Sequence, residues 1–209
     1  MKIMISNVIV IKNPTKEIKD FCIKELTFKN PEYQKKLKMG FYAYGTPKEI
    51  KLYDIYEDSL YVPTGFFNDL WKKHPYIDDY IDYSISVPIE VTSNIKLRDY
   101  QEPAVRAVKE NMCGIISMGC GMGKTCTCIQ CICETKQKTL WIAGTIDLIN
   151  QAKETAESLT SLKVSLITEG KCDTSGDMVC GTPQSIIKFI ENGTLKSDMF
   201  GFVVQDECH

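Results

Sequence analysis

Apolar and polar residues follow two different patterns on either side of about residue 92. From Lys96 onward, short apolar runs alternate with helix-length segments, whereas the first part is lysine-rich, aromatic and punctuated by prolines. Alternation of short apolar runs with helical segments predicts a parallel sheet covered by helices. We therefore expect a small accessory α+β domain over residues 1–92 and an α/β domain over residues 93–209.

The second part predicts a regular succession of strands and helices. Strands are expected from Cys113 to Met118, from Thr139 to Ala143, from Val164 to Thr168, from Met178 to Cys180 and from Phe202 to Val204. Helices are expected from Lys124 to Glu134, from Leu148 to Leu159 and from Pro183 to Glu191. In such a sheet, ligands bind at the carboxyl ends of the strands.

The first part predicts fewer elements. Two apolar stretches, Ile50 to Tyr53 and Leu60 to Val62, flank the turn-forming residues 57–59 and indicate a hairpin. Pro31 can open a helix that runs to Met39 and stops at Gly40, and a second short helix is expected from Asn68 to Lys73.

The clearest chemical signal is a glycine-rich loop between an expected strand and an expected helix. Such a loop curls its backbone N–H groups around a phosphate at a helix amino terminus. Lys124 would reach the β- and γ-phosphates, and the Thr125 hydroxyl would ligate Mg²⁺. The strict phosphate-loop pattern has glycine where this chain has Met118, so a glycine-rich turn with an incidental Gly-Lys-Thr is the alternative. The loop residues expected to contact nucleotide are Gly119, Cys120, Gly121, Met122 and Gly123.

A second signal closes the sequence, where an apolar strand ends in two carboxylates. Asp206 would hold the Mg²⁺ shell, and Glu207 would orient or deprotonate the water that attacks the γ-phosphate. Read alone, the pair could also be a solvated acidic loop.

Together these segments resemble superfamily 2 helicases. Asp206-Glu207-Cys208-His209 is similar to their DExH box, and Met118 to Thr125 is similar to their first motif. The resemblance implies a RecA-like fold, ATP and Mg²⁺ as cofactors, and a role for His209 in coupling hydrolysis to movement. Leu97 to Gln101 is similar to the adenine-recognition segment of the family, which implies that Gln101 reads the base edge and that Arg98 also contacts the nucleotide.

Two further segments resemble family motifs that approach nucleic acid. Gly144 to Gln151 is similar to motif Ia, which implies nucleic-acid contacts for Thr145 and Gln151, and residues 181–185 are similar to motif Ib. Thr182 can cap a helix whose first residue is Pro183, leaving N–H groups free for a phosphate. Read alone, each segment is also an ordinary helix start.

The first part resembles, more weakly, the amino-terminal extension of phage and bacterial helicases related to restriction-enzyme motor subunits. Three lysines, Lys35, Lys36 and Lys38, lie near Tyr42 and Tyr44 and could face phosphates and stack on bases. A solvated helix face explains the same lysines and is the preferred interpretation.

Composition limits the remaining possibilities. The net charge of −2 gives no global basic field, so contacts with nucleic acid must be local. No apolar run could span a bilayer and no signal peptide precedes the first part, so we expect no membrane and a cytoplasmic location in a bacterial cell or phage-infected host. The ten cysteines are expected to be reduced core residues, with a zinc site over residues 126–133 as the alternative, and His74 is expected at the surface.

We therefore expect the ATP-binding half of an ATP-dependent helicase or translocase that acts on DNA, whether duplex, forked or single-stranded. The resemblance implies a second RecA-like domain with arginine fingers, so we expect this chain to be a fragment that hydrolyses ATP very slowly. The alternative is a non-catalytic nucleic-acid-binding or inhibitory module built on a truncated helicase scaffold. A nucleotide kinase or AAA+ protein is disfavoured because Gln101 precedes the loop and His209 completes the box.

Overall fold

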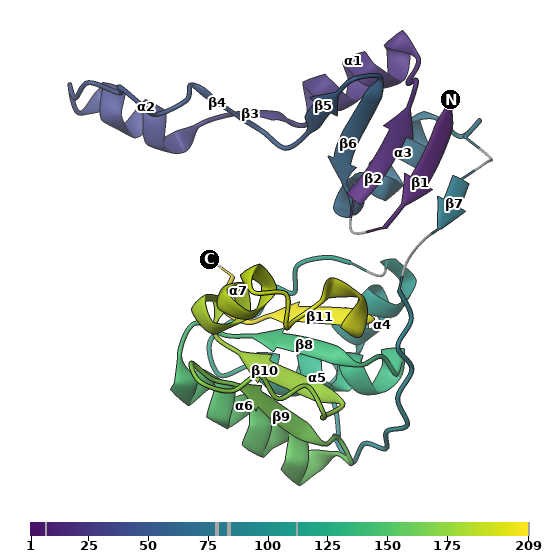
Figure 1. Cartoon of the computed structure of the whole chain (residues 1–209), viewed down its shortest axis with the longest axis vertical. Coiled ribbons are helices and arrows are strands. Elements are labelled where there is room, and N and C mark those ends of the chain that lie inside the picture. The colour runs from purple at the N-terminus through teal and green to yellow at the C-terminus, as the bar shows by residue number, and fades with distance from the viewer. Residues whose placement is uncertain (7, 78–79, 83–84, 112, 209) are drawn as a thin grey trace. The chain divides into compact units, whose positions relative to one another are not determined.

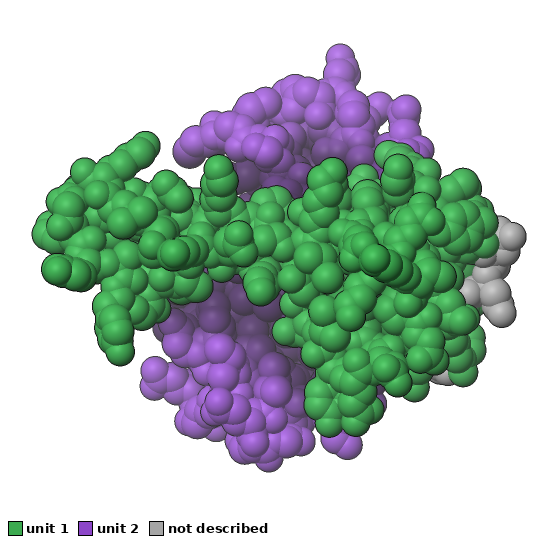
Figure 2. All heavy atoms as spheres, turned by 90° about the horizontal axis from the view of Figure 1, so that it is seen from above, with its two compact units in different colours: residues 1–84 green, residues 85–209 purple. Residues whose placement is uncertain are grey.

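The chain folds into two compact units, residues 1–84 (unit 1) and residues 85–209 (unit 2) (Figure 2). The computed structural model describes residues 1–6, 8–77, 80–82, 85–111 and 113–208. The division lies earlier than the boundary expected after residue 92. The stretch from Ile85 belongs to unit 2 because its backbone is bonded there: Ile89 N–H donates to the Lys136 carbonyl, and Lys138 N–H donates to the Val87 carbonyl.

Unit 1 is built on a five-stranded sheet with the order β5-β6-β2-β1-β7. Neighbouring strands are antiparallel except β1 and β7, which are parallel. Alternate residues such as Ile9 and Ile11 are buried, and they pack with Ile18 and Cys22 of α1 and Leu70 of α3 in one core. The elements are β1 (Lys2–Ile5), β2 (Val8–Lys12), α1 (Lys16–Glu25), β5 (Asp54–Tyr56), β6 (Ser59–Pro63), η1 (Thr64–Phe66), α3 (Phe67–Lys73) and β7 (Tyr80–Asp82).

A separate arm projects from unit 1 in both views (Figures 1 and 2). Its base is a two-stranded ribbon of β3 (Thr27–Lys29) and β4 (Glu49–Lys51), and α2 (Pro31–Lys38) lies beyond it. The expected helix from Pro31 is confirmed. The expected hairpin exists, but its first strand is β5 and not Ile50 to Tyr53, because Ile50 pairs with Phe28 in the ribbon.

His74 lies in the core of unit 1, so the prediction of a surface position is wrong. The residue is fully buried, and its ring meets that of Phe21 edge-on. His74 Nδ1 lies 2.9 Å from the Tyr76 hydroxyl and 4.0 Å from Glu17 Oε1. Phe21 and Glu17 belong to α1, which lies far from His74 in the sequence, so the sequence does not reveal these contacts.

Unit 2 contains an all-parallel sheet with the order β11-β8-β10-β9. Alternate strand residues face two cores: Trp141 packs with residues of α5 and α6, whereas Leu140 packs with residues of α7. Helices therefore cover both faces, and α4 packs against α5. The elements are α4 (Glu102–Asn111), α5 (Lys124–Thr135), β8 (Thr139–Ile142), α6 (Ile146–Leu159), β9 (Val164–Ile167), β10 (Met178–Gly181), α7 (Pro183–Glu191), η2 (Ser197–Met199) and β11 (Phe202–Gln205).

The strand expected from Cys113 to Met118 is not formed. The segment has no ladder partner among the described residues, and β11 lies at the edge of the sheet. Ile115 is 84% exposed, and Val203 on β11 is also exposed. Since a strand is defined by its hydrogen-bonded neighbour, a strand-like sequence without one stays irregular. The other expected strands and helices of unit 2 are confirmed within one or two residues.

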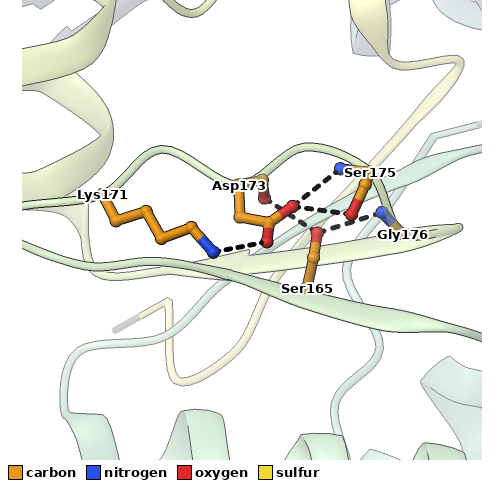
Figure 3. A network of polar contacts seen from close by, with 5 residues as sticks. All are labelled: Ser165, Lys171, Asp173, Ser175 and Gly176. Carbon is orange, nitrogen blue, oxygen red and sulfur yellow. Dashed lines mark hydrogen bonds and ion pairs between the residues drawn. The ribbon is translucent and has the colours of Figure 1, made fainter.

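The connection between β9 and β10 is fixed by a polar network (Figure 3). The Asp173 carboxylate accepts hydrogen bonds from Ser175 N–H and Ser175 Oγ, and it pairs with Lys171 Nζ at 3.0 Å. The Ser165 hydroxyl donates to the Asp173 carbonyl and accepts from Gly176 N–H. The network holds the loop against β9.

Among the described helices of the chain, none is long and apolar enough to cross a membrane.

Candidate nucleotide-binding site

The carboxyl ends of three strands meet at one edge of the unit 2 sheet. In the parallel register, Ile142 at the end of β8 lies beside Gly181 of β10 and Gln205 of β11. The backbone continues this register by one residue, since Asp206 N–H donates to the Ile142 carbonyl at 2.8 Å. Asp206 and Glu207 are therefore delivered to the edge at which a parallel sheet binds its ligands.

The glycine-rich loop leads into α5 in the manner that phosphate binding requires. Gly121 and Gly123 have φ angles of +74° and +82°, in the left-handed region that favours glycine. Gly123 is the N-cap of α5, and no side chain caps the helix. Because the first N–H groups of a helix have no partner within it, this end of α5 presents donors to an anion.

The two predicted catalytic segments are brought together by the fold. Lys124 Nζ lies 3.5 Å from Glu207 Oε1, with both side chains about one-third exposed. Glu207 adopts a φ of +51°, and its N–H donates to Asp206 Oδ1 at 3.0 Å. A lysine and two carboxylates thus converge beside the uncapped helix end. This arrangement can hold a phosphate while a carboxylate acts on water.

Two residues at this edge have the donor chemistry that a magnesium ion would require. Thr125 lies in the first turn of α5, and Asp206 follows β11. The two segments lie near each other, since Lys124 beside Thr125 approaches Glu207 beside Asp206 to 3.5 Å. Mg²⁺ prefers oxygen ligands and keeps several waters alongside one or two protein groups, and a hydroxyl with a carboxylate matches that preference.

Gln101 joins the segment before α4 to the phosphate loop. Its side chain is only 5% exposed. Gln101 Nε2 donates to the Met122 carbonyl at 3.0 Å and to the Gly123 carbonyl at 3.4 Å, while Oε1 accepts from Arg98 N–H at 2.9 Å. The amide expected to read adenine therefore binds the loop itself.

Tyr100 is a further contributor that the sequence did not single out. Its hydroxyl donates to the Met122 carbonyl at 3.2 Å and accepts from Arg98 Nη1 at 2.8 Å. Arg98 is thereby positioned at the loop through Tyr100. The only signal for this role in the sequence is that Tyr100 stands beside Gln101.

A pocket of about 370 Å³ lies next to this connection. This volume lies at the lower end of the range of roughly 300–1,000 Å³ that small-molecule pockets have. Its walls come from the segment before α4, from α5 and from the end of α6. The lining residues are Asn94, Ile95, Lys96, Arg98, Gln101, Gly123, Cys126 and Leu159.

The cysteines around the site differ in their exposure. Burial raises the pKa of the Cys128 thiol to about 12, so this thiol stays protonated at neutral pH. Cys120 in the loop and Cys208 beside Glu207 are exposed. Met122 also reaches into the loop, since its sulfur accepts from Gly119 N–H at 3.2 Å. Within the described part of the chain, no three or more acidic, histidine or cysteine side chains are grouped so that they could hold a metal ion together.

Two of the residues expected to approach nucleic acid, Thr145 and Thr182, lie at the starts of helices that follow strands of this sheet edge. The Thr145 hydroxyl accepts from Leu148 N–H at the start of α6, and the Thr182 hydroxyl accepts from Ser185 N–H at the start of α7. Gln151 is exposed on α6, away from these caps in sequence. His209, the last residue of the expected DExH box, lies outside the described residues.

Residues 94–209 match the family described as "Type III restriction enzyme, res subunit". This match covers more than half of the chain and includes every residue of the site above. The chain belongs to this family. The predicted resemblance to superfamily 2 helicases and the expected α/β, RecA-like fold of unit 2 are confirmed.

Two curated proteins are similar in sequence. A protein of Acanthamoeba polyphaga mimivirus named as an ATP-dependent RNA helicase, L396, is 30% identical over 162 residues, or 72% of this chain and 31% of its own length. The DNA 3'-5' translocase XPB2 of Sulfurisphaera tokodaii is 29% identical over 138 residues, or 66% of this chain and 30% of its own length. The chain thus spans about a third of the length of these relatives.

Solved structures of the UvsW helicase of bacteriophage T4 have a similar fold. One aligns with a TM-score of 0.65 and 17% identity, covering 100% of this chain and 83% of that chain. A second aligns with a TM-score of 0.59 and 16% identity, covering 99% of this chain and 53% of that chain. At these identities the likeness concerns the fold alone.

Proposed function

We propose that this chain is the ATP-binding part of an ATP-dependent helicase or translocase that acts on DNA. The observation that carries the proposal is the approach of Lys124 Nζ to within 3.5 Å of Glu207 Oε1 beside the uncapped start of α5. Lys124 and Glu207 lie far apart in the sequence of unit 2, and their meeting has a direct explanation in phosphoryl chemistry.

Each group has a defined task in this proposal. The N–H groups at the start of α5 and the Lys124 ammonium bind the β- and γ-phosphates, and they stabilise the negative charge of the transition state. When the phosphates bind the Lys124 ammonium, the ion pair between Lys124 and Glu207 breaks. The Glu207 carboxylate can now contact the attacking water. The carboxylate then orients that water or accepts its proton. Thr125 and Asp206 are the groups that would hold Mg²⁺, which neutralises phosphate charge when it is bound.

The nucleic-acid contacts are proposed for the helix starts at Thr145 and Thr182 and for Gln151. Both threonines lie just after β-strands that end at the nucleotide-binding edge. A movement of this edge would therefore displace a nucleic-acid strand bound at the two helix starts. One relative is named for RNA and the other for DNA. DNA is proposed because the family match is to a restriction-enzyme subunit.

Hydrolysis is proposed for the protein together with a second RecA-like domain that supplies arginine fingers. An arginine finger is worth roughly 10³–10⁵ in rate, so this chain alone is expected to hydrolyse ATP very slowly. The test compares the full natural protein with its Glu207→Gln variant. ATP hydrolysis is measured without nucleic acid and with duplex, forked and single-stranded DNA, and with RNA of the same sequence.

DNA-stimulated hydrolysis that the Glu207→Gln substitution abolishes would support the motor. A variant that still binds ATP while failing to hydrolyse it would assign Glu207 to chemistry and not to binding. Stimulation by RNA alone would replace DNA as the substrate. DNA binding with no affinity for nucleotide would overturn the proposal in favour of a non-catalytic scaffold.

A further inference from the structure

The arm of unit 1, residues 27–51, has the features of a binding element. It extends away from the five-stranded sheet as a ribbon followed by α2 (Figure 1). No residue of α2 is buried. A helix with no buried face is stabilised little by packing, so burial of a core does not explain why the arm exists.

Although it has no core, the arm has a defined shape. Asn30 is buried at its base, where Nδ2 donates to the Pro47 carbonyl at 2.9 Å and Oδ1 accepts from Glu32 N–H at 3.0 Å. Near the tip, Lys36 Nζ donates to Thr46 Oγ1 at 2.7 Å and pairs with Glu32 at 2.7 Å. These contacts close the segment after α2 back onto the helix.

Aromatic side chains are displayed at the tip. Tyr42 and Tyr44 are each 99% exposed, and Phe41 and Met39 are exposed as well. Exposed apolar surface is costly at about 25 cal/mol per Å², and a cluster of large apolar groups on a projecting element marks a contact site. Both tyrosine rings are therefore accessible to a partner that reaches the tip.

The charge of the arm identifies the kind of partner. It carries six lysines and two glutamates, a net charge of +4, whereas the whole chain has −2 and the remainder therefore −6. Among the residues that the structure describes, only Lys36 of these lysines is held in an ion pair. The exposed lysines are Lys29, Lys35, Lys38, Lys48 and Lys51. An isolated positive surface on an acidic chain complements a polyanion.

We propose that the arm binds a nucleic-acid strand with unstacked bases, with Tyr42 and Tyr44 stacking on bases and the lysines facing phosphates. Lysines alone would serve a duplex equally well, but fully exposed aromatic rings gain contact only when base faces are accessible. Single-stranded DNA, single-stranded RNA and the open end of a duplex share this chemistry. The inference shares a nucleic-acid partner with the proposed function but does not depend on the ATP site.

The test measures binding of the 209-residue chain to fluorescein-labelled oligothymidylate of about 20 nucleotides, to oligouridylate and to a blunt duplex, without ATP. All variants are made on a Lys124→Ala background, so that failure of the ATP site leaves the result interpretable. The stacking variant is Tyr42→Ala with Tyr44→Ala. Its matched control is Tyr56→Ala, which removes an exposed tyrosine on β5.

Loss of stacking should weaken oligothymidylate binding at least about fivefold, since each stacked base contributes roughly a 5–150-fold effect. The dependence on salt should stay unchanged. Lys35→Ala with Lys38→Ala should instead lower the slope of log affinity against log salt by about 1.4, or about 0.7 per phosphate contact. Lys72→Ala with Lys73→Ala, two exposed lysines on α3, is the charge control.

If the tyrosine variant bound oligothymidylate with unchanged affinity, the inference would be overturned. A protein partner would then be the remaining explanation for the exposed tip. Equal losses on duplex and on single strand would also overturn it, because phosphate contact alone would then explain the binding. Losses confined to oligothymidylate or to oligouridylate would support the inference and show which of the two kinds of strand the arm binds.

Discussion

Replacing Gln101 with alanine should destabilise unit 2 and change its nucleotide preference. The side chain is almost fully buried, and it makes one hydrogen bond at 2.9 Å to Arg98 N–H and one at 3.0 Å to the Met122 carbonyl. A neutral hydrogen bond contributes about 0.5–1.5 kcal/mol net. Gln101→Ala should therefore lower the free energy of unfolding by about 1–3 kcal/mol.

Tryptophan fluorescence gives a suitable assay. The chain has two tryptophans, and a Trp71→Phe background leaves only Trp141, which is buried in the unit 2 sheet. Urea unfolding of Gln101→Ala is compared with that of Gln184→Ala, which removes an exposed glutamine from α7. Equal midpoints for the two variants would refute the stabilising role of the Gln101 contacts.

The nucleotide effect follows from the same contacts. For Gln101 to read adenine, as the helicase resemblance implies, its amide must leave the Met122 carbonyl. Binding energy from the base must then offset the lost hydrogen bond. Gln101→Ala should bring the affinities for ATP and GTP close together, whereas Gln184→Ala should not. If Gln101→Ala still preferred ATP over GTP, the Gln101 amide would stabilise the loop without reading the base.

Three further outcomes are expected. Gly176→Ala should destabilise unit 2 by about 1–3 kcal/mol in urea unfolding, because a Cβ would lie 2.6 Å from the Lys163 carbonyl oxygen; an unchanged midpoint would contradict the packing described. Asp173→Asn should destabilise the chain at neutral pH, since hydrogen bonds from Ser175 hold the Asp173 pKa below its usual range; the difference from wild type should shrink as the pH falls below about 4, where the unfolded carboxyl takes up a proton, and a constant difference would be inconsistent with this. In the folded chain, iodoacetamide should modify Cys120 much faster than Cys180, whose pKa burial raises to about 12; mass spectrometry of the labelled peptides checks the order, and equal rates would exclude it.

The elements around the nucleotide site were predictable because their signals are local. The start of α5 follows from glycines before a helical pattern, and α7 follows from a capping threonine before Pro183. The meeting of Lys124 and Glu207 was predictable only through family motifs. The number of residues between Lys124 and Glu207 does not indicate how close their side chains lie in the folded chain.

Other features depend on contacts that sequence patterns do not reveal. The segment from Cys113 to Met118 has an apolar, strand-like composition, but strand formation requires a neighbour, and β11 is the edge of the described sheet. His74 looked like a surface residue because its partners, Phe21 and Glu17, lie far away in the sequence. The engagement of Gln101 with the loop is likewise a tertiary contact.

The amino-terminal strands were missed although a signal was present. Ile9 and Ile11 alternate with half-buried or exposed residues in β2, which is the period of two expected for a strand with one buried face. The run from Val8 to Ile11 is apolar on both faces, which obscures this alternation in the sequence. Only the folded structure shows that Ile9 and Ile11 are on the buried face of β2.

Direct binding of ATP tests the central claim, that Lys124 and the start of α5 form a nucleotide site. Isothermal titration of the chain with ATP and Mg²⁺ would compare the wild type with Lys124→Ala and with Lys196→Ala, an exposed lysine beyond α7. Because hydrogen bonds to charged groups contribute about 1.5–3 kcal/mol, Lys124→Ala should bind roughly ten- to hundredfold more weakly, and Lys196→Ala should bind like the wild type. Equal affinity of the two variants for ATP would contradict the account.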